Sequence, residues 1–222
     1  MRGKLIVFEG IEGSGKTTQI HHLRQWLDHK LSNGELPNYP TGVIVTRQPG
    51  GTSIGQHIRQ VLLKPSQGPE SLTSTSELLL YAADRAQHVE RILIPALETG
   101  HLVLCDRYTD STVAYQGYGR QLDLSLIDTL NTIATGGLSS DLTLWLKLDV
   151  TAGLERITTR GDTDRIEQAG IEFHRRVHKG FTAQAKVHGE KFIAVDASPA
   201  PETVAQHVQT IVSAYLQQWY AL

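Results

Sequence analysis

Short apolar segments alternate with longer segments of helical periodicity along the whole chain. The short segments are rich in Val, Ile and Leu, as parallel strands are when helices cover both faces of their sheet. The longer segments carry apolar residues three and four positions apart, the pattern of a helix with one buried face. This alternation predicts an α/β fold with a five-stranded parallel sheet and helices on both faces. The predicted strands are 5–8, 43–46, 102–105, 142–148 and 192–195, and the predicted helices are 16–30, 54–63, 76–97, 124–134, 152–159, 172–188 and 201–219.

The connections between these elements bear on domain organisation and on one helix start. They are short, so residues 1–222 are predicted to form a single domain. Before the third predicted helix, Ser74 and Glu77 stand three residues apart, which is the spacing of a capping box. We therefore expect Ser74 to be the N-cap of that helix.

The charge balance excludes several classes of partner. With 21 Lys and Arg against 23 Asp and Glu, the formal net charge is −2, so no broad basic field exists to attract nucleic acid. No apolar run approaches the roughly 18 residues that span a bilayer, and the first apolar run is interrupted by Glu9 and glycines, unlike a signal peptide. The single cysteine, Cys105, excludes an internal disulfide. We expect a cytoplasmic protein that binds neither nucleic acid nor membranes.

Charged residues follow the ends of the predicted strands. They are Glu9, Arg47, Asp106 with Arg107, Asp149 and Asp196. Open α/β sheets bind ligands in the crevice at the carboxyl ends of their strands. One such residue would be an ordinary solvated loop start, but several together, two of them arginines, favour a site for anions.

The first predicted strand leads into a glycine-rich motif. Residues 10–17 read G-x-x-x-x-G-K-T between a strand and a helix, the context of a phosphate-binding P-loop. The glycines let backbone N–H groups approach phosphate oxygens, and the following helix directs its positive end at the same charge. Lys16 supplies a cation for the terminal phosphates, and Thr17 supplies a hydroxyl for Mg²⁺. The predicted nucleotide-binding residues are Gly10, Ile11, Glu12, Gly13, Ser14, Gly15, Lys16, Thr17 and Thr18.

The P-loop alone does not separate switches, motors and phosphotransferases. The guanine-reading N-K-x-D and the D-x-x-G loop of a GTPase switch do not occur. A motor ATPase commonly ends a strand with Asp-Glu, whereas here Asp106 is followed by Arg107. Asp106 can hold Mg²⁺ through water, and the planar Arg107 guanidinium suits a second phosphate, unless the pair is merely a salt-bridged strand end. This pattern favours transfer to a phosphorylated acceptor.

Five segments together carry a resemblance that spans nearly the whole chain. They are FEGIEGSGKTT at 8–18, TRQPGGT at 46–52, LLLYAADRAQHV at 78–89, DRYTDSTVAYQGYGR at 106–120 and RGDTDRIE at 160–167. With them the sequence resembles the thymidylate kinase family in its bacterial form, which phosphorylates dTMP to dTDP with ATP. The resemblance implies a P-loop NTPase kinase fold with a mobile lid at about 156–170, a requirement for Mg²⁺, and a homodimer.

The resemblance also implies which residues hold the acceptor's phosphate and base. Arg107 grips the dTMP phosphate, with Arg47 nearby. Tyr81 and Arg85 are four residues apart on one predicted helix and therefore share a face. In relatives, an aromatic ring there stacks on thymine and the arginine reaches a base oxygen. Without the family, Tyr81 would be interpreted as core and Arg85 as its surface neighbour.

Further acceptor contacts are expected on a short helix after the Asp-Arg-Tyr motif and in the P-loop. Tyr115 packs on C2′ of the sugar and crowds out a ribose hydroxyl, so the enzyme is expected to prefer deoxynucleotides. Either Thr112 or Gln116 contacts the base edge at N3, and Glu12 lies near the 3′-hydroxyl and magnesium. The predicted acceptor-binding residues are Glu12, Arg47, Pro49, Tyr81, Arg85, Arg107, Ser111, Thr112, Tyr115 and Gln116, and the predicted metal-binding residues are Thr17 and Asp106.

Phosphoryl transfer also needs a fixed cation at the moving group, and the P-loop contains no arginine. Candidates follow the fourth predicted strand, at Arg156, Arg160 and Arg165. Interleaved acidic residues leave open that this stretch is a solvated mixed-charge segment. The resemblance implies that the lid supplies the arginine. The predicted catalytic residues are Lys16, Arg107, Arg160, Arg165 and Glu12.

The chain departs from the family pattern in two places. Gln48 stands where relatives commonly have Glu, and Thr158 stands where a basic lid residue is frequent. Both departures bear on rate more than on identity. The alternatives to a dTMP kinase are another nucleoside monophosphate or deoxynucleoside kinase, or a nucleotide-binding module without turnover.

Overall fold

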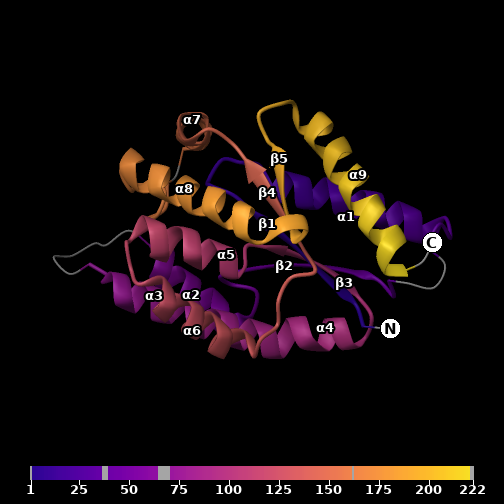
Figure 1. Ribbon diagram of the computed structural model, residues 1–222, viewed down its shortest axis with the longest axis horizontal. Helices are drawn as coiled ribbons and strands as arrows, with labels where there is room; N and C mark the ends of the chain where they lie inside the picture. The colour runs from indigo at the N-terminus through magenta and orange to yellow at the C-terminus, as the bar shows by residue number, and fades with distance from the viewer. Residues whose placement is uncertain (1, 37–39, 65–70, 162, 221–222) are drawn as a thin grey trace.

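Five parallel strands form the centre of the molecule (Figure 1). They are β1 (Lys4–Glu9), β2 (Val43–Arg47), β3 (Leu102–Asp106), β4 (Leu142–Lys147) and β5 (Phe192–Asp196). The computed structural model describes residues 2–36, 40–64, 71–161 and 163–220. Within these residues the strand order is β2-β3-β1-β4-β5, and neighbouring strands run parallel. The predicted strands and the parallel sheet are confirmed.

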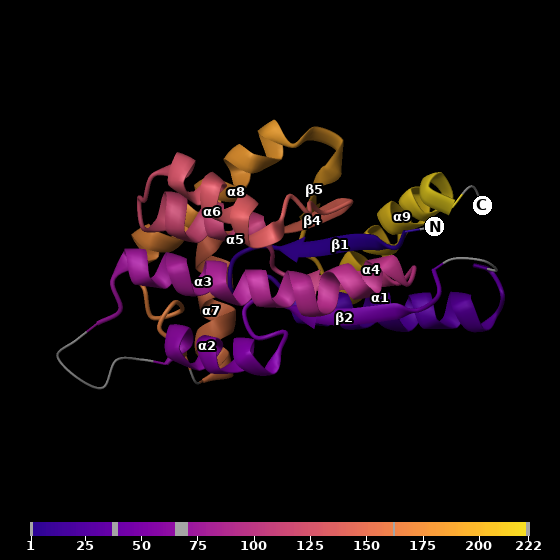
Figure 2. The ribbon, with the colours of Figure 1, turned by 90° about the horizontal axis from the view of Figure 1, so that it is seen from below.

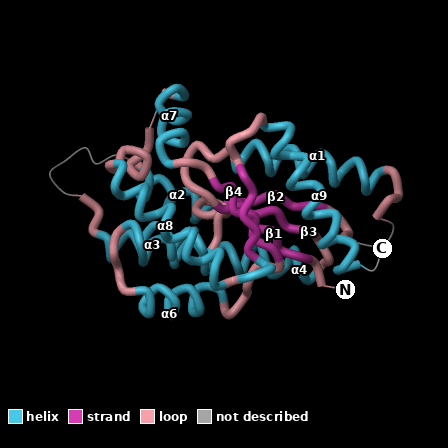
Figure 3. The backbone as a smooth tube through the Cα atoms, turned by 45° about the horizontal axis from the view of Figure 1, so that its top comes forward, coloured by secondary structure: helices cyan, strands magenta, loops and turns pink. Residues whose placement is uncertain are grey.

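Helices lie on both sides of this sheet (Figure 3), as predicted. They are α1 (Lys16–Ser32), α2 (Ser53–Leu63), α3 (Ser74–His88), α4 (Ile94–Glu98), α5 (Thr109–Thr112), α6 (Leu124–Thr135), α7 (Val150–Arg160), α8 (Ile171–Val187) and α9 (Pro201–Tyr220). Two π-helical segments, η1 (Val89–Leu93) and η2 (Val113–Gly119), follow α3 and α5, and a 3₁₀ turn, η3 (Gly189–Lys191), precedes β5. The predicted helix 76–97 is α3, η1 and α4 in succession.

The start of α3 differs from the prediction. Its N-cap is Thr73 and not Ser74, because the Thr73 side chain accepts the backbone N–H of Ser76 at 3.2 Å. Glu77 is fully buried and binds the side chain of Arg120 instead of turning back to the N-cap. Tertiary partners therefore outcompete the local capping pattern for this carboxylate.

The two faces of the sheet are covered by different helices. Along β1, Leu5 and Val7 pack in one apolar cluster with residues of η1 and α4. Ile6 and Phe8 point the other way and pack in a larger cluster with residues of α1, α8 and α9. Successive side chains of a strand face opposite sides, so the apolar residues 5–8 of β1 pack into both layers.

A group of helices lies beyond the carboxyl ends of the strands. Figure 2 shows α2, α3, α5 and α6 gathered at the end toward which β1 points, where α3 packs against both α2 and α6. The described residues of the segment 156–170, which are 156–161 and 163–170, lie between the last turns of α7 and the start of α8 at the same end of the molecule. That it moves as a lid stays a prediction.

Candidate active site

Lys16 lies at the start of α1 and is held by the loop that precedes it. Its Nζ donates hydrogen bonds to the carbonyl oxygens of Gly10 at 3.0 Å and Ile11 at 2.9 Å. Burial, with Arg107 beside it, lowers the pKa of Lys16 to about 8. An anionic phosphate beside the ammonium group would raise that pKa again and keep the lysine charged.

The loop around Lys16 depends on close backbone packing. Gly13 has a φ of 73°, and a Cβ there would lie 2.3 Å from the carbonyl oxygen of Gly153. Only glycine fits that approach. Of the predicted nucleotide-binding residues, Glu12, Gly13, Gly15, Lys16, Thr17 and Thr18 line the cleft described below, and Gly10, Ile11 and Ser14 are not part of its lining.

The two predicted metal-binding residues lie side by side. Thr17 Oγ1 donates to Asp106 Oδ2 at 3.3 Å, and both residues line the cleft. No cluster of three or more His, Cys, Asp or Glu that could hold a metal occurs among the described residues. Mg²⁺ usually takes one or two protein oxygens and completes its shell with phosphates and water. The hard oxygen donors of this pair fit that ion.

Arg107 occupies a strained turn at the end of β3. Its φ is 71°, a left-handed conformation that costs a non-glycine residue roughly 1–3 kcal/mol. The backbone N–H donates to the Phe8 carbonyl oxygen at 2.9 Å. The guanidinium donates to the Gly10 carbonyl oxygen at 2.9 Å, to Ser111 Oγ at 3.1 Å and to Glu12 Oε1 at 2.8 Å. These bonds fix Arg107 against the P-loop.

Glu9 supports the same turn from the end of β1. Its Oε1 accepts the backbone N–H groups of Tyr108 at 2.8 Å and Ser111 at 3.1 Å, and its Oε2 accepts the Ser111 hydroxyl at 2.6 Å. Burial, together with the nearby Asp110 carboxyl, raises the pKa of Glu9 to about 7. The sequence marked Glu9 only as a charged strand end, and its structural role was missed.

Glu12 joins the P-loop to the acceptor side. Its Oε1 also accepts the Tyr115 hydroxyl at 2.6 Å, and the centre of the Arg107 guanidinium lies 4.9 Å from the centroid of the Tyr115 ring. Burial alone would raise the pKa of Glu12, but Arg107 and Lys16 outweigh it and lower the pKa below its usual value. Glu12 is therefore a carboxylate that holds two acceptor-side groups in place.

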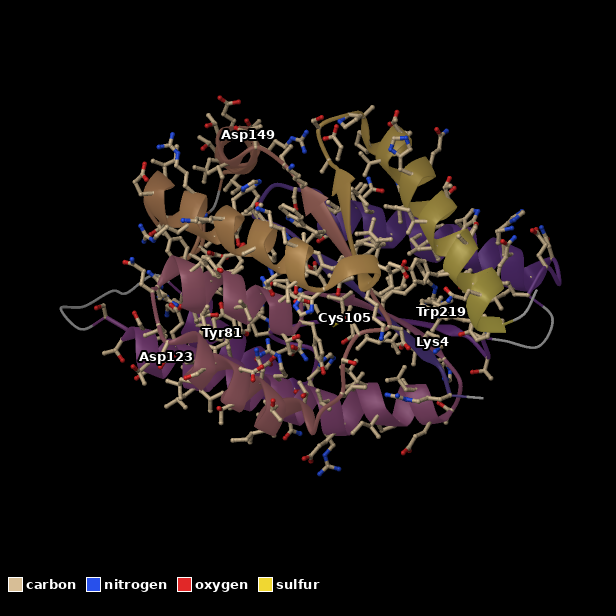
Figure 4. All side chains as sticks on the ribbon, in the orientation of Figure 1. Lys4, Tyr81, Cys105, Asp123, Asp149 and Trp219 are labelled. Carbon is tan, nitrogen blue, oxygen red and sulfur yellow. The ribbon has the colours of Figure 1, made fainter. Side chains whose placement is uncertain are left out.

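A cleft of about 420 Å³ connects these groups. Each predicted acceptor-binding residue lines it, from the P-loop to α3 and η2. Tyr81, at the α3 side, lies at the opposite end of the molecule from Lys4 and Trp219 (Figure 4). The structure thus brings the predicted acceptor residues together, and their individual roles stay predictions.

Arg85 is a buried residue of this cleft and not the surface neighbour that the helix pattern allowed. Its Nε donates to Gln48 Oε1 at 2.9 Å, its Nη1 donates to Asn131 Oδ1 at 2.7 Å, and its Nη2 donates to the Tyr108 carbonyl oxygen at 3.0 Å. Three separate elements therefore fix the direction of one guanidinium. A side chain held in this way is preorganised for a planar ligand.

Gln48, which departs from the family pattern, is part of a buried chain of hydrogen bonds. Because Gln48 Oε1 accepts from Arg85, its Nε2 faces His88 Nδ1, at 2.8 Å. Burial, together with Arg85, lowers the pKa of His88 to about 4, so the ring is neutral and carries its proton on Nε2. That nitrogen donates to Thr46 Oγ1 at 2.6 Å. Gln48 thus supports Arg85 with an amide, at a position where relatives commonly have an acid.

Two arginines of the predicted lid, Arg156 and Arg165, have side chains that lie in different places. Arg156 lines the cleft, and its Nη1 donates to the carbonyl oxygens of Gly13 at 3.3 Å and Ala197 at 3.4 Å. Arg165 lies outside the cleft lining and forms an ion pair with Glu77. The side chain of Arg160 lies outside the described residues. The catalytic roles of Arg160 and Arg165 stay predictions.

Sequence reasoning missed other cleft residues. Arg59 of α2 lines the cleft and donates to the Pro49 carbonyl oxygen at 3.0 Å. Burial lowers the pKa of Arg59 most, and the positive charge of Arg47 lowers it further. A single arginine on an amphipathic helix carries no local signal of such a role. The other lining residues outside the predictions are Gln48, Leu63, Asp84, Tyr108, Asp164, Ile166 and Glu167.

The parallel sheet, the P-loop at the end of β1 and the adjoining cleft define a P-loop nucleoside triphosphate-binding protein with a second anion site. The sequence matches the family described as Thymidylate kinase over residues 8–208. The chain therefore belongs to the thymidylate kinase family.

Individual relatives extend this match over the full chain. The thymidylate kinase of Trichodesmium erythraeum (strain IMS101) is 53% identical over 226 residues, which cover 99% of each chain. That of Cyanothece sp. (strain PCC 7425) is 54% identical over 232 residues, covering 99% of this chain and 97% of the relative. The crystal structure of thymidylate kinase from Ehrlichia chaffeensis has a TM-score of 0.75 at 32% identity, covering 96% of this chain and 100% of that one. None of the described helices has the length and apolar character needed to cross a membrane.

Proposed function

We propose that this protein is a kinase that transfers the terminal phosphoryl group of ATP to dTMP, and so forms dTDP for dTTP synthesis. One observation supports this best: a single cleft is lined by the P-loop with Lys16, by Arg107 held against that loop, and by Tyr81 of α3. Two anionic ligands held end to end in this way are what transfer to a nucleoside monophosphate requires.

The acceptor phosphate would bind among three arginines. Arg47, Arg59 and Arg107 all line the cleft, and the side chains of Arg47 and Arg59 both lie within 3.7 Å of where a Cβ on Gly50 would stand. Arg107 keeps a fixed direction because Glu12 and the backbone hold it. A guanidinium cluster of this kind suits a phosphate dianion far better than a neutral hydroxyl. This favours a nucleotide acceptor over a nucleoside.

The donor phosphates would bind to the backbone of residues 10–18 and to Lys16. Thr17 and Asp106 would hold Mg²⁺, which neutralises phosphate charge when it is bound. The acceptor is already an anion, so no strong general base is needed and alignment of the two phosphates is the main requirement. Lys16 and Arg107 supply fixed positive charge on either side of the transferred group.

The base and sugar would lie against α3 and η2. Tyr81 and Arg85 face the cleft from α3, and Thr112 and Gln116 face it from α5 and η2. Tyr115 is 6% exposed and packs edge-on against Phe173 and Phe181, so its ring has little freedom to move away from a 2′-hydroxyl. This rigidity supports a preference for deoxynucleotides.

A panel of acceptors tests the proposal. ADP release is measured with ATP and Mg²⁺ in the presence of dTMP, dUMP, UMP, dCMP or thymidine. We expect dTMP to be phosphorylated fastest and thymidine not to react, because thymidine has no phosphate for Arg107. ATP binding without acceptor-dependent ADP release would support the non-catalytic alternative, and a faster rate with UMP or dCMP would support a different kinase.

We also propose that the protein is a cytoplasmic homodimer that buries the α2, α3 and α6 face. These helices are neighbours (Figure 2), and large apolar side chains on them are exposed. The most exposed are Ile133 at 73% and Val61 at 58%, followed by Ile54, Leu79, Leu124 and Leu126. An apolar surface spread over adjacent helices is typical of a self-association face. Measurement of the mass in solution tests this, and a monomer at micromolar concentration would contradict it.

A further inference from the structure

Glu77 lies behind the base end of the cleft without lining it. Its side chain is 1% exposed in α3. Oε1 accepts Gln116 Nε2 at 2.8 Å and Arg120 Nε at 3.2 Å, and Oε2 accepts Arg120 Nη2 at 3.1 Å. Arg165 Nη2 also donates to Oε2. Each donor reaches this one buried carboxylate from an element other than α3.

The charge state of Glu77 decides how the Gln116 amide is turned. Burial alone would raise the pKa of Glu77, but the hydrogen bonds from Arg120 and Gln116 outweigh it and lower the pKa. An ionised carboxylate only accepts hydrogen bonds, so the NH₂ group of Gln116 must face Glu77. The carbonyl Oε1 of Gln116 then points away from Glu77.

Gln116 itself lines the cleft and is 1% exposed. The two polar atoms of its amide differ in their partners. No described residue donates a hydrogen bond to Gln116 Oε1, whereas Nε2 is bound to Glu77. The side chain therefore presents an acceptor, and not a donor, toward the ligand.

We propose that Glu77 is a positioning residue that sets the pyrimidine selectivity of the cleft through Gln116. This inference rests on the proposed function. Thymine and uracil carry a hydrogen-bond donor at N3, whereas N3 of cytosine is an acceptor. With its NH₂ held by Glu77, Gln116 offers Oε1 to the N3–H of thymine and repels the lone pair at N3 of cytosine.

The variant Glu77→Gln is expected to reverse this orientation. The new side chain has one oxygen, and Arg120 donates to both carboxylate positions, so the second donor at each position decides where that oxygen goes. Arg165 at the Oε2 position can only donate, whereas Gln116 at the Oε1 position can turn its own oxygen toward residue 77. The oxygen therefore takes the Oε2 position. With oxygen at that position, the new NH₂ group faces Gln116. The Gln116 amide then turns its oxygen toward residue 77 and its NH₂ toward the cleft, which suits cytosine.

The test compares the dissociation constants of dTMP and dCMP, measured by calorimetry. We expect the dTMP-over-dCMP preference to fall by at least about tenfold in Glu77→Gln. The hydrogen bond from thymine N3–H to Gln116 Oε1 is then lost, and the Gln116 NH₂ group and the N3–H group, both donors, face each other. Arg120→Lys is the matched control, because it disturbs the bonds from Arg120 to Glu77 but keeps a positive charge beside that carboxylate and leaves the bond from Gln116. It should keep the wild-type preference, and both variants should keep the wild-type affinity for ATP.

Two results would overturn the inference: an unchanged preference in Glu77→Gln, or an equal change in Arg120→Lys. If Glu77→Gln does not fold, a crystal structure of the wild-type protein with dTMP decides the matter. A Gln116 amide bonded to both Glu77 and N3 supports the inference, and an amide away from the base overturns it. Wild-type protein without dTMP-dependent turnover would instead overturn the proposed function.

Discussion

The donor end and the acceptor end of the cleft are built from different chemical groups. At the donor end, residues 10–18 form one continuous loop whose backbone and Lys16 face the phosphates. At the acceptor end, side chains from β3, α2, α3 and η2 converge, and each comes from a different part of the chain. A backbone site needs only the right turn, whereas a side-chain site needs every contributing side chain to be held in place.

The acceptor end shows how that holding is done. Glu9 binds the turn that carries Arg107, Gln48 binds Arg85, and Glu77 binds Gln116. In each case a buried polar group from one element fixes a cleft residue of another. We therefore expect the acceptor end to be sensitive to substitutions that never touch a ligand.

The largest expected effect concerns the predicted lid, from which Arg156 and residues 164, 166 and 167 also line the cleft. Arg160→Ala and Arg165→Ala should each lower kcat by roughly 10²–10³-fold with little change in dTMP affinity, because such an arginine meets charge that develops only during transfer. Arg156→Ala, measured alongside, shows whether the arginine bound to the Gly13 carbonyl oxygen shares this role. Single-turnover rates and dTMP binding are measured together. Normal turnover in both Arg160→Ala and Arg165→Ala would contradict a catalytic lid.

Arg107→Ala should separate the two ends directly. We expect kcat/KM for dTMP to fall by about 10²-fold, because the variant loses a fixed guanidinium that faces the acceptor phosphate. ATP affinity should fall less, because the variant loses the bonds from Arg107 to Gly10 and Glu12 but keeps those from Lys16 to the carbonyl oxygens of the loop. Arg175→Ala is a suitable control, because that side chain is 58% exposed and remote in role. Equal losses for ATP and dTMP would mean that the ends are not separable.

Tyr115 tests selectivity at the sugar. Tyr115→Ala should reduce the preference for dTMP over its ribose counterpart by about tenfold, because the ring that crowds C2′ is removed. Tyr115→Phe keeps the ring and loses only the hydroxyl that binds Glu12, so its preference should be retained. The ratio of the two kcat/KM values is the measurement. The same loss in both variants would show that the hydroxyl, and not the ring, sets the preference.

The smallest effect concerns the buried support of Arg85. Burial lowers the pKa of His88 to about 4 in the folded protein. As the pH falls from about 6.5 to about 4, the unfolded chain therefore binds a proton on His88 that the folded chain does not, and the free energy of unfolding decreases. Glu9, with its pKa raised to about 7, acts in the opposite direction over part of that range. Total stability therefore does not isolate His88, and an NMR titration of its ring does. A midpoint near 6.5 would show that the ring is not held as Gln48 and Arg85 require.

The sequence supported the fold and the donor end more fully than the acceptor end. Alternating apolar runs predicted all five strands, because burial on both faces leaves a continuous apolar signature. The P-loop was recognisable because its chemistry lies within residues 10–17. The N-cap of α3 was predicted one residue late, since Glu77 binds Arg120 and does not turn back to cap the helix.

What the sequence determined by itself was therefore local: strands, helices and a phosphate loop, each specified by neighbouring residues. The tertiary structure decided the rest. It placed Arg59 in the cleft, buried Arg85, turned Gln116 by way of Glu77, and separated Arg156 from Arg165. The physical reason is that the direction of a long polar side chain depends on partners from distant segments, which the spacing of residues along the chain does not encode.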